Sequence, residues 1–162
     1  MTTDAPSPGS TWPQRIARWL LGAALLVAGT GHLTVGREEF LAQVPPWLPI
    51  DADLVVLASG VVEIVLGLAL LLARGRWRVR TGWATALFFL AIFPGNIAQF
   101  TEGRDGFGLD TDLARGIRLL FQPVLVAWAL WSTGAWRAWR DHRAARSAGR
   151  AGAAERSATM DA

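Results

Sequence analysis

The sequence contains no cysteine, no lysine and no tyrosine, and it has only two histidines. Without cysteine, the chain cannot form disulfides, thiolate metal sites, iron–sulfur clusters held by thiolates or covalently attached haem, and its redox compartment stays undetermined. We interpret the missing lysine and tyrosine, beside nine tryptophans, as compositional bias. Any electron-transfer role therefore requires a carrier that another molecule supplies.

Long hydrophobic runs are abundant, since 52% of the 162 residues are hydrophobic. A helix needs about 20 apolar residues to cross a bilayer. Four segments meet that length: residues 16–35, 54–73, 81–100 and 113–133. They predict an all-α fold, an integral membrane four-helix bundle over residues 14–140. The flanking segments, residues 1–13 and the basic residues 141–162, are expected to be disordered.

The arginines predict the orientation of this bundle. Twelve of the sixteen lie in the N-terminal flank, in the link between the second and third segments, or in the C-terminal tail. The positive-inside rule then places both termini in the cytoplasm, and we expect a multi-pass protein of the bacterial inner membrane. The net charge of +3 alone suggests nucleic acid. The arginine distribution instead favours contact with the lipid bilayer and predicts no nucleic-acid partner.

A signal peptide is the alternative interpretation of the first segment, because arginines precede an apolar stretch. Cleavage would remove His32, and no convincing small-residue cleavage site follows. We therefore expect the segment to be retained as a membrane span.

Polar residues gather in the outer half of the predicted bilayer, whereas the inner halves read as nearly pure hydrocarbon. Glu63 shares a helix face with Gly60 and Gly67, and small residues there let another helix approach closely. Each span contributes at least one polar side chain to this half. The predicted ligand-binding pocket comprises His32, Glu63, Asn96, Gln99, Arg118 and Gln122.

The Glu63 carboxylate requires a partner, because a lone charge at mid-bilayer costs about 2.5–3.5 kcal/mol. Arg118 lies at a compatible height on the fourth span, one turn from Gln122. We therefore predict a buried ion pair between Glu63 and Arg118. The alternative is that these polar groups only fix the register of the helices, without any ligand.

The first outer link, "EEFLAQVPPWLPID", mixes apolar residues with prolines. It is expected to lie across the mouth of the pocket as an interfacial lid, and a rigid connector is the alternative interpretation. The lid residues would be Phe40, Pro45, Pro46 and Trp47.

Five short motifs resemble, in order, those of the DoxX-like four-helix membrane proteins: "GHL", "EEFLAQVPPWLP", "LASGVVEIVLGLALLL", "FPGNIAQF" and "IRLLFQPVLVAW". The resemblance covers about residues 22–131. His32-Leu33 and Pro94-Gly95-Asn96 depart from the family's usual His-Phe and Pro-Ala-Asn. The resemblance implies a compact inner-membrane bundle, in a family whose members are linked to thiosulfate:quinone oxidoreduction, methylamine utilisation and oxidative-stress complexes. It supports the fold better than any reaction.

Two functions remain open from the sequence. The first is a quinone-associated accessory subunit, in which His32 and Arg118 donate to quinone carbonyls and Glu63 relays protons. The chain would hold no intrinsic cofactor and would need a redox or membrane partner protein. The alternative is a non-enzymatic module that binds a lipid or hydrophobic ligand, or assists assembly of a partner membrane protein.

Two other classes are less favoured, and the oligomeric state stays open. A proton- or ion-coupled transporter lacks an evident inverted repeat, although a homo-oligomer of four-span chains could serve. Bis-histidine haem is excluded because His142 lies at the cytoplasmic end, and one interior His with one interior Glu provides too few ligands for zinc. No metal site is predicted.

Overall fold

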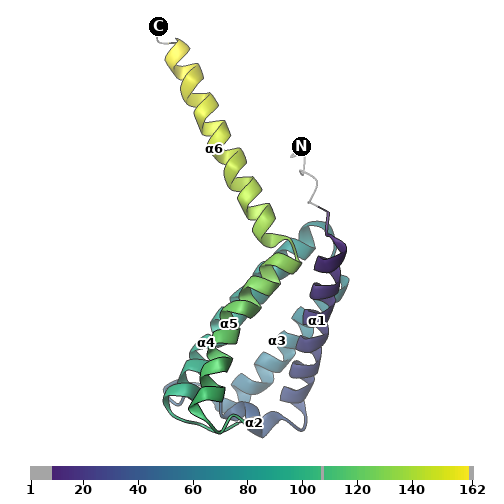
Figure 1. Ribbon diagram of the computed structural model, residues 1–162, viewed down its shortest axis with the longest axis vertical. Helices are drawn as coiled ribbons and strands as arrows, with labels where there is room; N and C mark the ends of the chain where they lie inside the picture. The colour runs from purple at the N-terminus through teal and green to yellow at the C-terminus, as the bar shows by residue number, and fades with distance from the viewer. Residues whose placement is uncertain (1–8, 107, 161–162) are drawn as a thin grey trace.

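The computed structural model describes residues 9–106 and 108–160, with only the backbone over residues 151–160, and all of its regular elements there are helices (Figure 1). The six helices are α1 (Trp12–Leu33), α2 (Arg37–Leu41), α3 (Ala52–Leu72), α4 (Gly75–Thr101), α5 (Asp112–Ser132) and α6 (Ala135–Met160). The predicted all-α class is confirmed over this part of the chain.

Four of these helices, α1, α3, α4 and α5, are long and apolar enough to cross a membrane. They coincide with the four predicted spans. The largest difference is at α4, which begins at Gly75 instead of residue 81. The connection from α3 is only two residues long, and Gly75, with φ +53°, accommodates the sharp turn there. The prediction of four helices long and apolar enough to span a membrane is therefore confirmed.

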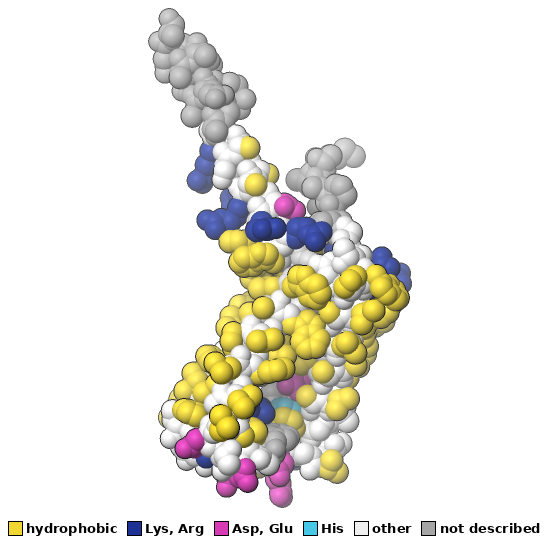
Figure 2. Space-filling view, in the orientation of Figure 1, with side chains coloured by type: hydrophobic (Ala, Val, Ile, Leu, Met, Phe, Trp, Pro, Cys, Tyr) yellow, Lys and Arg dark blue, Asp and Glu magenta, His cyan; other side chains and the backbone are white. Residues whose placement is uncertain are grey.

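The four long helices run up and down, so both ends of the described chain emerge on one side of the bundle (Figure 1). We call this side the terminal end. The opposite side carries α2 and the link between α4 and α5, and we call it the α2 end. Apolar side chains cover the flank of the bundle between these two ends (Figure 2). Basic side chains gather toward the terminal end and acidic ones toward the α2 end.

Glycines bring α1 and α3 into close backbone contact. A Cβ atom on Gly29 would lie 2.6 Å from the Gly60 carbonyl oxygen, and one on Gly67 would lie 2.8 Å from the Gly22 carbonyl oxygen. The two glycines on each helix are seven residues apart, about two turns, so they face the partner together. Small residues at a helix interface allow this close packing in a membrane protein. The closely packed pair α1–α3 forms one wall of the cavity described below.

The second helix pair, α4–α5, closes the bundle through an apolar core. A Cβ atom on Gly82 of α4 would collide with the Thr133 side chain, which shows how closely the two elements approach at the terminal end. The core cluster holds Leu21, Leu25, Leu66, Leu70, Ala86, Phe89, Ala129, Leu130 and Ala135. This packing joins both helix pairs near the middle and the terminal end of the bundle.

The terminal end also buries polar groups, so the prediction of nearly pure hydrocarbon there is wrong. Arg18 donates to the Ala73 carbonyl at 2.8 Å, and Gln14 Nε2 donates to the Trp131 carbonyl at 2.8 Å. Both acceptors lie at the C-terminal ends of helices, where carbonyls lack a partner within their own helix. Long side chains from α1 satisfy them, a role that hydropathy along one segment does not reveal.

The tail also differs from its predicted disorder. Residues 141–160 continue α6, which projects beyond the bundle (Figure 1). Its composition explains the difference, because alanine and arginine are among the best helix formers. Of the predicted N-terminal tail, residues 1–8 lie outside the described residues. Residues 9–11 precede α1, which begins at Trp12.

Candidate functional site

A cavity of about 730 Å³ lies toward the α2 end, between the α1–α3 pair and the α4–α5 pair. Most of its wall is apolar. Its polar side chains come from all four long helices and from the link after α2: His32, Gln43, Ser59, Glu63, Asn96, Arg118 and Gln122. In Figure 2 acidic, basic and histidine side chains are visible inside a hollow on the flank of the bundle. The cavity therefore lies beside α2 and also opens on the flank of the bundle.

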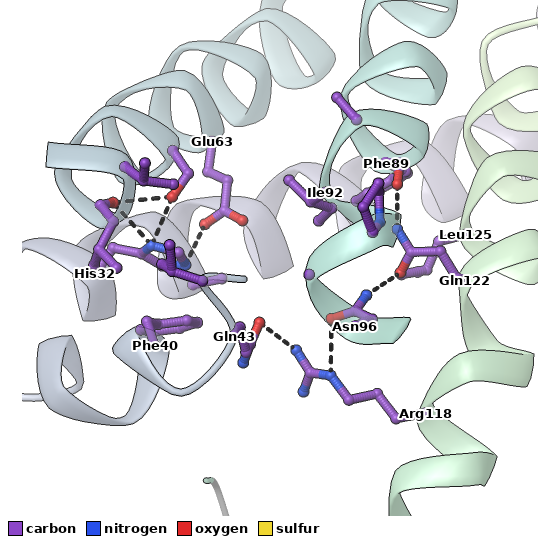
Figure 3. Close-up of a pocket in the computed structure, with 18 of the residues that line it drawn as sticks. His32, Phe40, Gln43, Glu63, Phe89, Ile92, Asn96, Arg118, Gln122 and Leu125 are labelled. Carbon is purple, nitrogen blue, oxygen red and sulfur yellow. Dashed lines mark hydrogen bonds and ion pairs between the residues drawn. The ribbon is translucent and has the colours of Figure 1, made fainter. Parts of the chain in front are cut away.

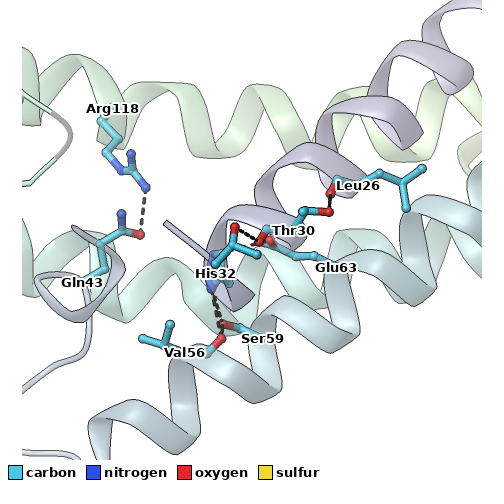
Figure 4. A network of polar contacts seen from close by, with 9 residues as sticks. Leu26, Thr30, His32, Gln43, Val56, Ser59, Glu63 and Arg118 are labelled. Carbon is cyan, nitrogen blue, oxygen red and sulfur yellow. Dashed lines mark hydrogen bonds and ion pairs between the residues drawn. The ribbon is translucent and has the colours of Figure 1, made fainter. Parts of the chain in front are cut away.

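One polar cluster joins α1 to α3 (Figure 4). The Nδ1 atom of His32 lies 3.1 Å from the Val56 carbonyl oxygen and 3.0 Å from the Ser59 hydroxyl. Its Nε2 atom lies 3.4 Å from Glu63 Oε2. The imidazole stacks on Phe40, with ring centroids 3.4 Å apart. These contacts hold His32 on three sides.

Glu63 is buried, with 6% of its surface exposed, yet its Oε2 atom accepts no hydrogen bond. The contact with His32 is within ion-pair distance but does not have hydrogen-bond geometry. Leaving a buried polar group without a hydrogen bond is costly. The carboxyl group therefore retains an acceptor position for a donor that enters the cavity.

A second polar chain crosses the cavity from the link after α2 to α5 (Figure 3). Arg118 donates to Gln43 Oε1 at 2.8 Å and to Asn96 Oδ1 at 3.4 Å. Asn96 Nδ2 in turn donates to Gln122 Oε1 at 3.0 Å, and Gln122 Nε2 donates to the Phe89 carbonyl. The amide group of Gln43 also leaves its buried Nε2 donor without a hydrogen-bond partner.

The structure changes the partner predicted for Glu63. Glu63 pairs with His32, and Arg118 bonds to the side-chain oxygens of Gln43 and Asn96 (Figure 3). The close contact of α1 with α3 brings His32 next to Glu63. Gln43, in the link after α2, accepts a hydrogen bond from Arg118. Glu63 and Arg118 nevertheless line the same cavity. The two residues therefore meet in one cavity as predicted, but each of them pairs with a different residue.

Five of the six predicted pocket residues line this cavity, and Gln99 does not. Gln99 is 1% exposed, and its amide nitrogen packs near Gly106 instead. Two further polar lining residues, Ser59 and Gln43, are not among the predicted ones. The helical spacing from Glu63 identifies Ser59, since it lies one turn away on the same face. Gln43 lies in a link and has no periodic signal.

The predicted lid contributes three of its four residues. Phe40, Pro45 and Trp47 line the cavity, whereas Pro46 is exposed and does not. The link is held in place by Arg104, which donates to the Val44 carbonyl. The Gln43 carbonyl packs against Gly95 where a Cβ atom would collide with it, so the departure from Pro-Ala-Asn has a steric reason.

The donor set suits an organic ligand better than a metal ion. Among the side chains that the structure describes, those of residues 9–106 and 108–150, no three His, Asp or Glu side chains come together as candidate metal ligands. The cavity instead offers a carboxyl acceptor at Glu63, an amide donor at Gln43, and long apolar walls. An amphiphile with a small polar head matches these surfaces.

The described residues form an all-helical fold whose four long apolar helices indicate a multi-pass membrane protein, and a cavity with several polar side chains lies between two pairs of these helices. Residues 21–133 match the family model described as "Domain of unknown function (DUF8561)", and the chain belongs to this family. The match contains α3, α4 and α5 completely and the part of α1 from residue 21 onward, together with all residues of the cavity. Neither the curated proteins nor the solved structures provide a match to the chain.

Proposed function

We propose that the protein binds the headgroup of a quinone in the outer half of the bacterial inner membrane, as an accessory subunit of a redox system. The observation that carries this proposal is a pair of buried atoms without hydrogen-bond partners on the cavity wall. Glu63 Oε2 can accept from a hydroxyl group, and Gln43 Nε2 can donate to a carbonyl group. A quinone and its reduced form present these two kinds of group.

The orientation supports an outward-facing cavity. Under the positive-inside rule, the arginine-rich terminal end lies in the cytoplasm and the acidic α2 end outside. Exposed indole rings at the terminal end support a membrane–water interface there, because tryptophan is enriched at such interfaces in membrane proteins. They belong to Trp12, Trp19, Trp77, Trp131, Trp136 and Trp139.

The side opening supports a ligand that arrives through lipid. The hollow faces the apolar flank of the bundle, so a molecule dissolved in the bilayer reaches it without crossing water (Figure 2). The apolar wall, which includes Leu25, Phe121 and Leu125, accommodates a hydrocarbon tail. The polar head then lies among His32, Glu63 and Arg118.

The chain's own residues suit binding and proton handling. Arg118 stays oriented by two amide oxygens, and His32 lies at ion-pair distance from Glu63, so a proton can be held between imidazole and carboxyl. A quinone would supply two-electron chemistry when bound. Because cysteine is absent, electrons would come from a partner protein. Relationship to the DoxX-like proteins remains part of this proposal.

A second candidate function is a non-enzymatic module that binds a lipid or assists assembly of a partner membrane protein. The exposed apolar residues of the link between α2 and α3 favour it, because Trp47 is 64% exposed and Ile50 is 51% exposed. Such side chains at the α2 end can contact lipid or another protein. Deleting the gene and measuring the abundance of partner membrane proteins would identify this role.

The quinone proposal is tested by loading and retention. The purified protein is incubated in detergent with a short-tailed benzoquinone, separated by gel filtration and extracted for chromatography. Wild type is expected to retain quinone above empty micelles, and Glu63→Gln and Arg118→Ala are each expected to lower retention about tenfold, the equivalent of one lost hydrogen bond to a charged group.

Arg37→Gln is the matched control, since Arg37 is exposed and pairs with Asp53 outside the cavity. It is expected to retain quinone like wild type. Retention no greater than that of empty micelles, or equal retention by all variants, would contradict the proposal.

A further inference from the structure

A second cavity, of about 470 Å³, lies at the terminal end, where α5 meets α6. Its floor is apolar, formed by Pro123, Val126, Ala127 and Leu130 of α5. Trp131, Trp136, Arg137 and Arg140 complete the lining together with Gln14 and Gly134. The ligand site described above uses none of these residues, so this cavity is separate in space and in chemistry.

The lining changes character along the helix axis. Pro123 and Trp131 are eight residues apart, which is about 12 Å along α5. The apolar floor therefore runs along the membrane-crossing helix, and two indole rings mark its end. The guanidinium groups of Arg137 and Arg140 follow directly beyond them. This sequence of surfaces reproduces the order of acyl chain, glycerol region and phosphate in a phospholipid.

The turn between the helices positions the two arginines. Gly134 has φ +73°, and its amide donates to the Trp131 carbonyl, so α5 stops and α6 restarts in a new direction. Arg137 and Arg140 lie three residues apart and share one face of α6. Both lie in the first turns of α6 and line the cavity.

The charge of this cavity is uncompensated. Within the described part of the chain, neither Arg137 nor Arg140 forms an ion pair, and no acidic residue lines the cavity. Arginine suits a phosphate because its planar guanidinium can donate two hydrogen bonds at once. Anionic lipids are also the charged component of the cytoplasmic leaflet surface.

We propose that this cavity is a binding site for an anionic phospholipid, with the phosphate held by Arg137 and Arg140 and an acyl chain along α5. The proposal does not depend on quinone binding. Two indole rings at the height of the glycerol region provide the amphipathic contact that interfacial tryptophans make. The site would tie the base of α6 to the lipid surface.

The test measures lipid retention by mass spectrometry of intact protein. The full chain is reconstituted with equal phosphatidylcholine and phosphatidylglycerol, re-extracted in mild detergent, and the bound lipids are counted. Wild type is expected to retain phosphatidylglycerol preferentially. Arg137→Gln with Arg140→Gln is expected to reduce that preference about 25-fold, since one surface arginine contributes about fivefold.

The matched control is Arg143→Gln with Arg146→Gln, which removes the same charge from the next turns of α6. Arg143 lies over the Trp139 ring, with its guanidinium carbon 4.8 Å from the centroid, and does not line the cavity. This control should keep the preference. Equal loss in both double variants would mean a diffuse basic surface and would overturn the proposal.

An added inorganic phosphate arm separates the two sources of the anion. The lipid site predicts that phosphate leaves the bound phosphatidylglycerol in place, because the apolar floor holds the acyl chain. Displacement by phosphate, or no preference for phosphatidylglycerol over phosphatidylcholine in wild type, would overturn it. Identical helical circular dichroism of all variants confirms that they fold.

Discussion

Replacing Gly29 with leucine is expected to force α1 away from α3 and lower the free energy of unfolding by about 3 kcal/mol or more. A Cβ atom at this position would lie 2.6 Å from the Gly60 carbonyl oxygen and 2.9 Å from an Ile64 side-chain carbon. The first neighbour is backbone, which cannot move aside as a flexible side chain can. Unfolding in a denaturing detergent, followed by circular dichroism, measures the loss.

The control for this change is Gly116→Leu in α5. Its Cβ atom would meet only a Phe100 ring carbon at 3.6 Å, an ordinary van der Waals contact. Leucine also has a higher helix propensity than glycine. We expect a change below about 1 kcal/mol in either direction. Equal losses for the two variants would show that α1 and α3 do not pack through Gly29.

Replacing His32 with alanine is expected to be the most damaging change inside the cavity, at about 3–5 kcal/mol. It removes the partner of the buried Glu63 carboxyl, the contacts with the α3 backbone, and the ring that stacks on Phe40. Removing one member of a buried pair leaves the other without compensation. The same detergent unfolding measurement gives the free energy.

A double variant separates the pair from the other contacts of His32. Adding Glu63→Gln to His32→Ala is expected to recover part of the loss, because the uncompensated acid is gone. The interaction energy follows from the two single variants and the double variant. Strictly additive losses would show that His32 and Glu63 do not act as a pair.

Much of the bundle follows from hydropathy and spacing. The four spans are identified by apolar length, and the glycine face of α3 by the seven-residue separation of Gly60 and Gly67. Another helix was expected to approach this face closely, and the structure shows that this helix is α1. The depth of each residue in the bilayer, estimated from a rise of 1.5 Å per residue, also predicts that most of the polar residues lie in one cavity. These are one-dimensional properties, so one sequence is sufficient for them.

The partners within the cavity depend on direction around the helix axes. Depth along the helices led to Arg118 as the predicted partner of Glu63. The glycine contact of α1 with α3 selects His32. Gln43 lies in a link without periodicity, so its contact with Arg118 depends on a loop conformation that sequence spacing does not encode.

The terminal end shows the same limit. Arg18 counts among the arginines of the N-terminal flank, yet it bonds to the carbonyl end of α3, and Gln14, for which the sequence made no prediction, bonds to the carbonyl end of α5. Such contacts depend on which helix end lies beside them. The helix over residues 141–160 was missed for a different reason. Disorder was predicted from low hydrophobicity, but alanine and arginine have high helix propensities, and these favour a helix here.

The central claim is that the cavity at the α2 end holds a membrane-dissolved molecule with a small polar head. Mass spectrometry of small molecules extracted from the purified protein tests it most directly, with Ala28→Phe, which narrows the cavity wall on α1, as the comparison. We predict that wild type releases a stoichiometric quinone and that the narrowed variant releases little. Extracts of wild type that contain only bulk phospholipid and detergent, in the same amounts as the narrowed variant, would contradict the account.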